Sequence, residues 1–485
     1  MGFLLSSIAV YAFPPEPENS DLTVELIYAG EVPNNTISAT PNIASPVKHK
    51  QEMFIVDQHG AIFKWSKKNE QTVKIFDISQ APPELTLTNN PEAILNVVGG
   101  RSKKNLYVVF SSPTLPSELN AGPYKTNECS LPTDGSQRVC DLPELIETHP
   151  HLIGIGGTNT FDMYRMGTVA TGLAFLPLIS MSGVYQILYE FHYDGEKLSK
   201  PRPIIALETQ AGLATHRGGG MTLTKDGQIL WATGDAVVFG LQGRYLPQDN
   251  TSHIGKILSI SPKTGAIKVM AKGQRNVQRL QLVISEKQKD NLLAWTNIGG
   301  WVSEEFNIIR VKDLNKHPNF GWGCEKNIPG TVQCALNAKT REGTFYVTLG
   351  TPLTFGTPPK AGDAPIPEQG YVQPFSQYGR IQPFSFAAIT GPVISKKSLN
   401  KISALFGDLP SGAILATTAP LLSKGAITYK VNLFDEYGNP LAGNSLNALN
   451  GGNRVDPRFF LFPDGTAGVL LEATGKFYRI KEIEP

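Results

Sequence analysis

The sequence is short of cysteine, of net charge and of long apolar or helical runs. Its 485 residues carry a formal net charge of only +2, which leaves no basic surface of the kind that binds nucleic acid. None of the four cysteines forms a C-x-x-C motif or lies near histidines at zinc-finger spacing, so a cysteine-based metal site is disfavoured. No long stretch repeats its apolar residues with the helical period of about 3.6. We therefore expect neither a nucleic-acid-binding protein nor a helical one.

Glycine and proline are abundant instead, with 47 and 36 residues. Both residues mark turns and loops, and their frequency favours β structure over helix. The hydrophobic fraction of 41% and the charged fraction of 18% are ordinary for a soluble globular protein. All-β architectures can use a chain of this length as one domain.

The N-terminus combines an apolar run with a stretch rich in Pro and Glu. The run ends near Ala12 and resembles a short signal peptide, although no Lys or Arg precedes it. It is too short to span a bilayer, so we expect no transmembrane segment there. We expect residues 1–12 to be a signal-peptide remnant and the protein to be periplasmic or secreted. A frayed apolar terminus is the alternative.

The cysteines form two close pairs, Cys129 with Cys140 and Cys324 with Cys334. A disulfide in either pair would close a loop of about ten residues and contribute about 2–3 kcal/mol. Disulfides persist in oxidising compartments, which agrees with export. Four free thiols in a cytosolic protein are the alternative.

A polar turn followed by a short apolar strand recurs six times along the chain. D-G, S-G and related turns before β-branched or aromatic residues are typical of strands and hairpins. Four-stranded propeller blades recur at about 40–50 residues. The six units occupy residues 57–65, 99–110, 224–235, 285–297, 406–418 and 462–475.

These units predict an all-β fold, a six-bladed β-propeller of four-stranded antiparallel blades. Residues 21–485 would form this single domain, with large loop insertions near 111–180 and 320–400. The segment 21–31 could pair with the last blade and close the ring, which would remove an exposed sheet edge. Seven or eight blades, with degenerate units in the long gaps, are the alternative.

A histidine followed by three glycines opens the third unit. Propellers bind ligands at one end of the central channel, where loops join the strands of different blades. A histidine with a pKa near neutrality suits a general base, so His216 could take a proton from a hydroxyl. The missing side chains of Gly218, Gly219 and Gly220 would let a flat ligand approach the backbone. A polar residue in a tight turn is the alternative interpretation of His216.

Arg275 and Asn276 stand side by side just before an expected strand. Their cationic and amide donors could stabilise an oxyanion or a carbonyl oxygen. An exposed polar pair without a role is the alternative.

Gly299 and Gly300 lie in another turn that could reach the same end of the ring. Their backbone carbonyls suit a hard cation such as Ca²⁺. Glu304 and Glu305 could support that turn, or they could belong to a solvated turn.

These segments, in this order and with the hairpin that joins them, resemble the glucose/sorbosone dehydrogenase family. This family contains the soluble quinoprotein glucose dehydrogenases and the aldose sugar dehydrogenases. The likeness runs through ATHRGGGMTLTKDGQILWATGD, HIGKILSISPKTGAI, GQRNVQRL, EEFNIIRV and NFGWG. It is good over about residues 210–325 and faint in the first two blades and towards NRVDPRFFLFPDG.

The resemblance implies a six-bladed propeller that binds pyrroloquinoline quinone (PQQ) on the channel axis, with Ca²⁺ under the quinone. His216 matches the base that takes the proton of the sugar's anomeric hydroxyl while hydride passes to the quinone. Arg275 and Asn276 match the pair that polarises the quinone carbonyl. Gly299 and Gly300 fall where backbone carbonyls bind Ca²⁺. Such a cofactor carries the redox chemistry, and the protein supplies orientation and electrostatics.

The sequence departs from the family pattern at several positions. Ile298 stands where the family has a polar Gln or His, and Gly300 stands where it has Pro. The candidates for the family's Arg-x-Arg pair are Arg454 and Arg458, and the candidate for its cofactor-binding Lys is Lys424. Because PQQ is a polycarboxylate, these cations matter for its binding.

Two functions follow from this interpretation. The first is an exported, PQQ- and Ca²⁺-dependent dehydrogenase that oxidises an aldose sugar or a related alcohol and passes electrons to an external acceptor. In it His216 and Arg275 are catalytic, and Gly220 and Asn276 join the three cations in binding the cofactor. The second is a non-catalytic binding propeller that kept the scaffold and lost the cofactor. A hydrolase or lyase is a third possibility, but the chain has no G-x-S-x-G motif.

Overall fold

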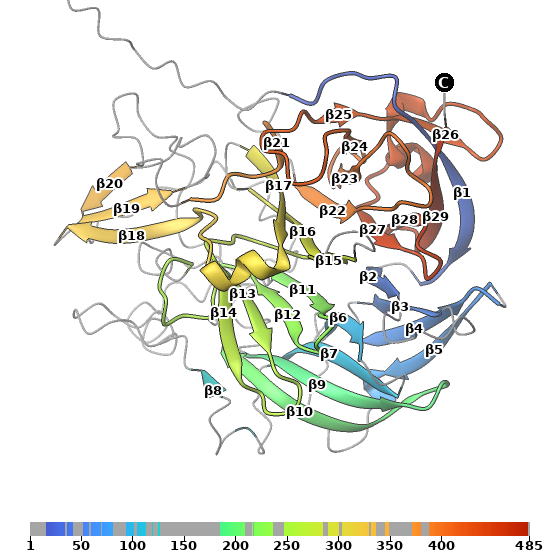
Figure 1. Cartoon of the computed structure of the whole chain (residues 1–485). Helices are drawn as coiled ribbons and strands as arrows, with labels where there is room; N and C mark the ends of the chain where they lie inside the picture. The colour runs from blue at the N-terminus through green and yellow to red at the C-terminus, as the bar shows by residue number, and fades with distance from the viewer. Residues whose placement is uncertain are drawn as a thin grey trace, which may run out of the picture.

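The structure is a computed structural model in which small β-sheets form a ring (Figure 1). It describes residues 16–33, 36–41, 52–57, 60–68, 70–80, 94–100, 104–112, 119, 125–126, 185–208, 216, 218–235, 247–284, 290–299, 303–328, 331–335, 345–348, 371–379 and 388–483. The expected signal peptide, residues 1–12, lies outside these ranges. None of the helices within them is long and apolar enough to cross a membrane.

Six sheets make up the ring, so the predicted six-bladed β-propeller is confirmed. Blade 1 consists of β2 (Thr36–Pro41), β3 (Glu52–Asp57), β4 (Ala61–Ser66) and β5 (Gln71–Asp77). Blade 2 consists of β6 (Ile94–Gly99), β7 (Asn105–Ser112), β9 (Tyr185–Tyr193) and β10 (Leu198–Glu208), with the short β8 (Lys125–Thr126). Blade 3 consists of β11 (Gly218–Leu223), β12 (Ile229–Thr233), β13 (Lys256–Ile260) and β14 (Ile267–Lys272).

Blades 4 to 6 complete the ring. Blade 4 consists of β15 (Leu280–Val283), β16 (Leu292–Asn297), β17 (Ser303–Arg310) and β21 (Ser376–Gly379). Blade 5 consists of β22 (Ile389–Val393), β23 (Ala404–Asp408), β24 (Ile414–Thr417) and β25 (Tyr429–Lys430). Blade 6 consists of β27 (Pro457–Leu461), β28 (Ala467–Leu471), β29 (Lys476–Ile483) and β1 (Thr23–Glu31), with β26 (Asn432–Asp435). Short 3-10 helices are η1 (Ile78–Gln80), η4 (Val311–Lys316), η5 (Ala442–Asn444) and η6 (Leu446–Asn450).

The N-terminal strand closes the ring, as the sequence predicted. β1 pairs antiparallel with β29, from Thr23 opposite Ile483 to Glu31 opposite Lys476. Val24 and Leu26 on this strand are buried in the last blade. The first and last parts of the chain therefore share one sheet, and neither leaves an unpaired edge at the joint.

The six turn-and-strand units of the sequence fall one in each blade, but they are not equivalent. In blades 2, 3, 4 and 6 the unit is the first hairpin of the sheet, whereas in blades 1 and 5 it is the second, β3–β4 and β23–β24. This difference explains part of their uneven spacing.

The two long interruptions lie inside single blades. β7 pairs directly with β9, so residues 113–184 come between neighbouring strands of blade 2. β17 pairs with β21, so residues 311–375 come between neighbouring strands of blade 4. The second interruption ends before the predicted residue 400, because β22 already begins blade 5 at Ile389.

A seventh, three-stranded sheet lies in this second interruption and projects away from the ring (Figure 1). It contains β18 (Gly323–Ile328), β19 (Thr331–Ala335) and β20 (Phe345–Thr348). The β18–β19 register places Cys324 directly opposite Cys334. The disulfide between them stays a prediction, and Cys129 and Cys140 lie outside the described residues.

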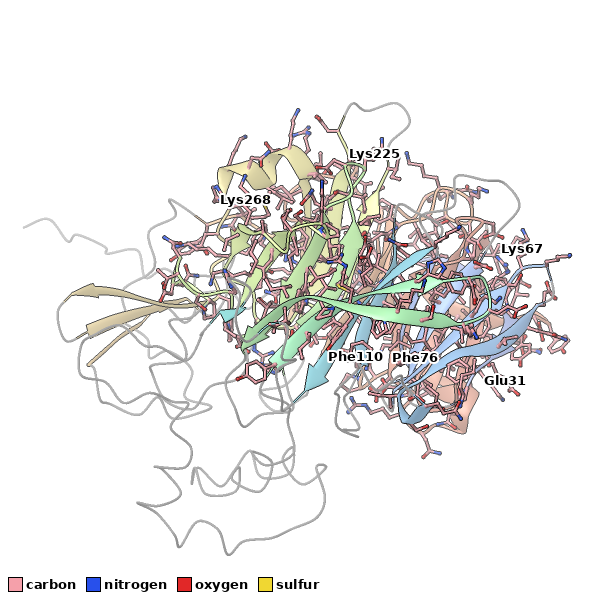
Figure 2. The ribbon with its side chains drawn as sticks, turned by 90° about the horizontal axis from the view of Figure 1, so that it is seen from below. Glu31, Lys67, Phe76, Phe110, Lys225 and Lys268 are labelled. Atoms are coloured by element: carbon pink, nitrogen blue, oxygen red, sulfur yellow. The ribbon has the colours of Figure 1, made fainter. Side chains whose placement is uncertain are left out.

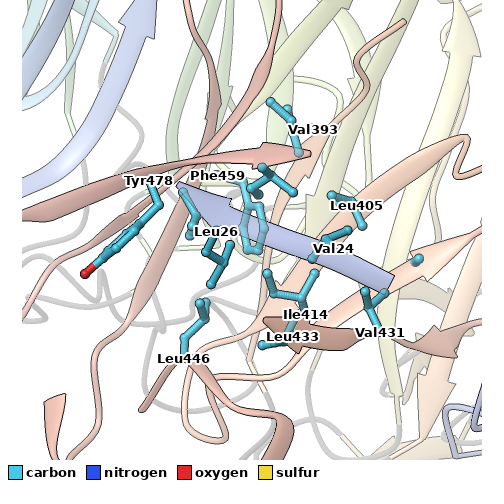
Figure 3. Packing of buried hydrophobic residues seen from close by; sticks show 14 of the residues in the cluster. Val24, Leu26, Val393, Leu405, Ile414, Val431, Leu433, Leu446, Phe459 and Tyr478 are labelled. Atoms are coloured by element: carbon cyan, nitrogen blue, oxygen red, sulfur yellow. The ribbon is translucent and has the colours of Figure 1, made fainter. Parts of the chain in front are cut away.

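The hydrophobic core is divided among the six junctions between neighbouring blades. Strands covered on both faces are mostly apolar, and β12 (ILWAT) and β16 (LLAWTN) are buried at every position, including their polar last residues. Phe76 and Phe110 meet between blades 1 and 2, with ring centroids 6.1 Å apart (Figure 2). Figure 3 shows the corresponding cluster between blades 5 and 6, where Phe459 packs among aliphatic side chains. This packing fixes the blades relative to one another and so positions the loops at their ends.

Candidate functional site

His216 lies beside Asp235 at the end of blade 3 where β11 begins. The β11–β12 register pairs Gly218 with Thr233, which brings the residues flanking the two strands together. His216 Nδ1 is 2.9 Å from Asp235 Oδ1. Because a carboxylate only accepts, the proton of a neutral His216 is on Nδ1, and Nε2 carries the lone pair. We call the end of the ring where β11, β15 and β27 begin the His216 end.

The backbone around His216 is tightly folded. His216 itself has φ 57°, a left-handed conformation that is uncommon outside glycine. A Cβ on Gly234 would lie 1.6 Å from the carbonyl oxygen of His216, so only glycine fits there. The position of the imidazole is therefore set by backbone packing as well as by Asp235.

The glycines after His216 pack against the protein's own backbone. A Cβ on Gly218 would lie 2.6 Å from the carbonyl oxygen of Ala232, and one on Gly220 would lie 2.9 Å from the backbone nitrogen of Arg279. Gly220 is buried, and its N–H donates to the Val277 carbonyl at 3.1 Å. These contacts account for Gly218 by close packing within blade 3 and for Gly220 by close packing between blades 3 and 4, whereas the sequence had suggested that they open the backbone to a ligand.

Trp322 completes the surroundings of Asp235, and the sequence analysis did not single out either residue. The indole Nε1–H of Trp322 donates to Asp235 Oδ2 at 2.8 Å. Both carboxylate oxygens of Asp235 are thus engaged, one by His216 and the other by Trp322. The Arg275 guanidinium lies over the Trp322 ring, 5.2 Å from its centroid, which is a cation–π geometry.

Arg275 and Asn276 join this group from the loop before β15. The Asn297 side-chain oxygen accepts from the backbone N–H of both residues, at 3.0 and 3.1 Å. The Asn276 side-chain oxygen accepts from Gly218 N–H at 3.1 Å, and the Arg275 carbonyl accepts from Asp235 N–H at 2.7 Å. The loop before β15 of blade 4 is therefore hydrogen-bonded to Asp235 itself and to Gly218, which follows His216 in the chain.

The predicted cation-binding turn lies next to Arg275. Arg275 Nη1 donates to the Ile298 carbonyl at 3.1 Å. The Ile298 side chain is buried in the core between blades 4 and 5, so an apolar residue is accommodated there. Gly299 is buried, and its N–H donates to Glu304 at 2.9 Å. Gly300 lies outside the described residues.

Glu304 and Glu305 are both buried, at 0% and 4% exposure, which removes the interpretation of a solvated turn. Glu304 supports the backbone of Gly299, as the sequence suggested. Within the described ranges no group of three His, Cys, Asp or Glu side chains could hold a metal ion. A cation at this turn would therefore depend on backbone carbonyls, among which Gly299 is the described candidate.

Two further arginines belong to the His216 end. Arg458 on β27 donates to Glu472 from Nε at 3.0 Å and reaches Gln278, in the loop after Arg275, from Nη1 at 2.7 Å. Burial alone would lower the pKa of Arg458, but Glu472 outweighs it and raises that pKa. Arg279, which the sequence analysis missed, follows in the same loop, and burial lowers its pKa to about 10, so it stays charged at neutral pH.

The other two predicted cations, one shortly before β27 at the His216 end and one in blade 5, are both exposed. Arg454 is exposed and pairs with Asp456 at 2.7 Å. Lys424 is exposed in the loop that joins β24 to β25. The first strand of blade 5, β22, begins at the His216 end, and each following strand of the blade runs antiparallel to the one before it. The β23–β24 turn therefore lies at the His216 end, and the loop from β24 to β25 lies at the opposite end. The structure therefore brings Arg458 to the site but places Lys424 at the far end of blade 5.

The electrostatic surroundings favour a neutral His216. Burial lowers the pKa of the imidazole below its usual 6.5 and the positive charge of Arg275 lowers it further, against the opposing effect of Asp235. The side chain keeps 18% exposure, so the ring remains accessible. A neutral, oriented imidazole with a lone pair on Nε2 can accept a proton, which is what a general base requires.

No protein-family model matches the chain, and no curated protein is similar to it in sequence. Solved structures are similar in fold. The PQQ-bound form of an aldose sugar dehydrogenase from Streptomyces coelicolor is 14% identical, with a TM-score of 0.52 over 97% of this chain and 100% of that one. A soluble aldose sugar dehydrogenase from Escherichia coli in the apo-form is 14% identical, with a TM-score of 0.51 over 96% and 100%.

A glucose dehydrogenase is similar to the same degree, at 14% identity and a TM-score of 0.52 over 94% of this chain and 98% of that one. At such identity the likeness establishes the propeller fold, and what the site does must be argued from its own residues.

Proposed function

We propose that the protein is a quinone-dependent oxidoreductase that removes the hydroxyl proton, and a hydride from the carbon bearing that hydroxyl, from an aldose sugar or a related alcohol. The observation that carries this proposal is the hydrogen bond between His216 and Asp235 beside Arg275, and the lowered pKa of His216 agrees with a base. The fold shared with a PQQ-bound aldose sugar dehydrogenase supports the choice of quinone and substrate class.

In this function His216 Nε2 accepts the proton of the substrate hydroxyl. Asp235 keeps the imidazole in the Nδ1–H tautomer and stabilises the imidazolium that forms. When bound, PQQ would supply the acceptor for the hydride from the carbon that bears this hydroxyl, so the alcohol would become a carbonyl. Arg275 provides a fixed positive charge next to the base, where negative charge would develop on the cofactor.

The described cations fit a polycarboxylate such as PQQ in part. Arg275, Arg279 and Arg458 belong to the His216 end, and guanidinium groups bind carboxylates with paired hydrogen bonds. Arg458 already pairs with Glu472, so binding of a further carboxylate would require it to share its donors. We assign Arg275, Arg279 and Asn276 as the residues that would hold the cofactor, with Arg458 as a further contact.

For Ca²⁺, we propose a site at the turn of Gly299 and Gly300, formed by backbone carbonyls. The Glu304 carboxylate accepts from Gly299 N–H, and its negative charge would favour a cation at the turn. Export to the periplasm or outside the cell is also part of the proposal, supported by the N-terminal apolar run and the paired cysteines.

Reconstitution tests the proposal directly. The purified chain is incubated with PQQ and Ca²⁺, dialysed, and examined for quinone absorbance and for dye reduction with a panel of aldoses and alcohols. Retained quinone and substrate-dependent dye reduction are expected. Loss of all quinone on dialysis, together with no dye reduction, would sink the proposal.

A binding propeller without cofactor is the second candidate, and two observations favour it. The Arg458–Glu472 pair neutralises one cation at the site, and Lys424 lies in a loop away from it. In this function the His216 end would bind a partner without turnover. The reconstitution experiment distinguishes the two, because only the oxidoreductase retains quinone.

A further inference from the structure

Glu304 joins blade 4 to blade 5 at the His216 end. It is the second residue of β17 and has no exposed surface. Its Oε2 accepts from Gly299 N–H at 2.9 Å and from Ile389 N–H at 3.1 Å. Gly299 follows the second strand of its own blade, and Ile389 begins the first strand of the next. A single carboxylate oxygen therefore ties the site turn to the neighbouring sheet.

The turn held by Glu304 also determines where Arg275 lies. The Ile298 carbonyl accepts from Arg275 Nη1 at 3.1 Å, and Ile298 N–H donates to the Asn276 carbonyl at 3.2 Å. If the turn shifts, the guanidinium loses the Ile298 carbonyl as an acceptor and its position over Trp322 changes. Hydrogen bonds from backbone N–H groups to a buried carboxylate are strong, which makes Glu304 an effective anchor.

We infer that Glu304 is a positioning residue, whose carboxylate fixes the Ile298–Gly299 turn and, through it, the Arg275 guanidinium. Its anchoring of the turn follows from the apo structure, and its effect on cofactor binding rests on the proposed function. The proposal concerns geometry, so it predicts that an uncharged acceptor of the same shape keeps part of the anchor, although its hydrogen bonds are weaker than those of a carboxylate. Both N–H groups bond the same oxygen, and the amide oxygen of Gln can take its place.

The chain contains a matched control at the other end of the ring. Glu482 on β29 is also buried, at 8% exposure, and its carboxylate accepts from the backbone N–H of Lys401 and Ile402 in blade 5. It too joins two blades, but it touches no residue of the site. Glu482→Ala removes the same chemical group without the link to Arg275.

Hydrogen exchange on the cofactor-free protein tests the anchor. In Glu304→Ala the amides of Gly299 and Ile389 should exchange at least about tenfold faster, as expected for local loss of protection. In Glu304→Gln, which keeps the acceptor and loses the charge, they should exchange more slowly than in Glu304→Ala, and in Glu482→Ala the change should be confined to residues 400–402. Unchanged protection of Gly299 and Ile389 in Glu304→Ala would overturn the inference. If that variant does not fold, Glu304→Asp, which withdraws the carboxylate by one methylene, takes its place.

A double-mutant cycle tests the link to Arg275. Loss of a residue that orients a binding group typically lowers affinity by about 10- to 100-fold. Glu304→Ala should therefore raise the Kd for PQQ in that range. Combined with Arg275→Ala the effects should be less than additive, because Glu304 acts through Arg275. Additive effects, or an unchanged Kd, would contradict the inference. Failure of the wild type to bind PQQ would instead overturn the proposed function, and hydrogen exchange would still decide the role of Glu304.

Discussion

Trp322 donates its indole N–H to Asp235 at 2.8 Å, so the carboxylate that orients His216 is itself held by a residue 87 positions further along the chain. Asp235 has no freedom to rotate while His216 and Trp322 occupy its two oxygens. The imidazole is consequently fixed through a chain of contacts that spans blades 3 and 4.

Trp322→Phe removes this hydrogen bond and keeps an aromatic ring under Arg275. We expect kcat/KM of the reconstituted enzyme to fall by at least about tenfold, the usual effect of losing an outer hydrogen bond to a catalytic group. Steady-state kinetics with PQQ and Ca²⁺ measures it. The matched control is Trp231→Phe, which lies in the core between blades 2 and 3, has no hydrogen bond from its indole N–H to any described residue, and should lower stability more than activity. Equal loss in both variants would contradict a specific role for Trp322.

The pH dependence of turnover should report the pKa of His216. Because burial and Arg275 hold that pKa below 6.5, the base form is present at neutral pH and is lost only as the pH falls through the lowered value. The acid limb of kcat/KM against pH should therefore lie below 6.5. Arg275→Gln removes a repelling charge and should move the limb to higher pH, whereas Asp235→Asn should move it to lower pH. A limb that stays in place in both variants would show that another group titrates.

Much of the fold could be predicted from the sequence, because hairpins are local. The turns before 229–233 and 467–471 contain D-G next to apolar runs, and both of these apolar segments are strands in the structure. The ring closure by residues 23–31 was also predictable, since an unpaired edge strand is unfavourable. The assignment of each hairpin to a position within its blade was not, because the first and second hairpins of a sheet have similar patterns.

The site was predictable only in part. His216, Arg275 and Asn276 were found from residue type and order, and the structure brings them together. Asp235 and Trp322 are polar or aromatic residues at strand ends, and only the pairing of β11 with β12 and the path of the chain after β17 place them beside His216. The far-end position of Lys424 follows from strand direction, which spacing along the sequence does not reveal.

Stability at low pH should depend on Asp464, which links blades 6 and 1. Burial raises its pKa, but hydrogen bonds from Thr466 and Lys67 and the charge of Arg479 outweigh this and lower the pKa to about 2. A lowered carboxyl pKa stabilises the folded state above the unfolded value of about 4 and loses that effect as the pH falls towards 2.

Asp464→Asn should therefore lower the free energy of unfolding at pH 6 by about 1 kcal/mol, after allowance for solvent screening, and by less at pH 2.5. Urea unfolding at the two pH values measures the difference. An equal loss at both would show that the effect is not one of charge.

Closure of the ring by β1 should carry much of the stability of the last blade. Leu26 is 2% exposed in the core of that blade, and Leu26→Ala should destabilise the protein by about 2–4 kcal/mol. Glu25→Ala on the same strand removes only a partly exposed ion pair with Lys481 at 3.9 Å and should cost less than about 1 kcal/mol. Thermal and urea unfolding compare them. Similar effects in the two variants would argue against a closed ring in solution.

Binding of PQQ and turnover in His216→Ala, measured side by side, test the central claim most directly. With Ca²⁺ present, the variant should retain quinone after dialysis as the wild type does, while aldose-dependent dye reduction falls to background. Quinone retention with full turnover in His216→Ala would contradict the assignment of His216 as the base.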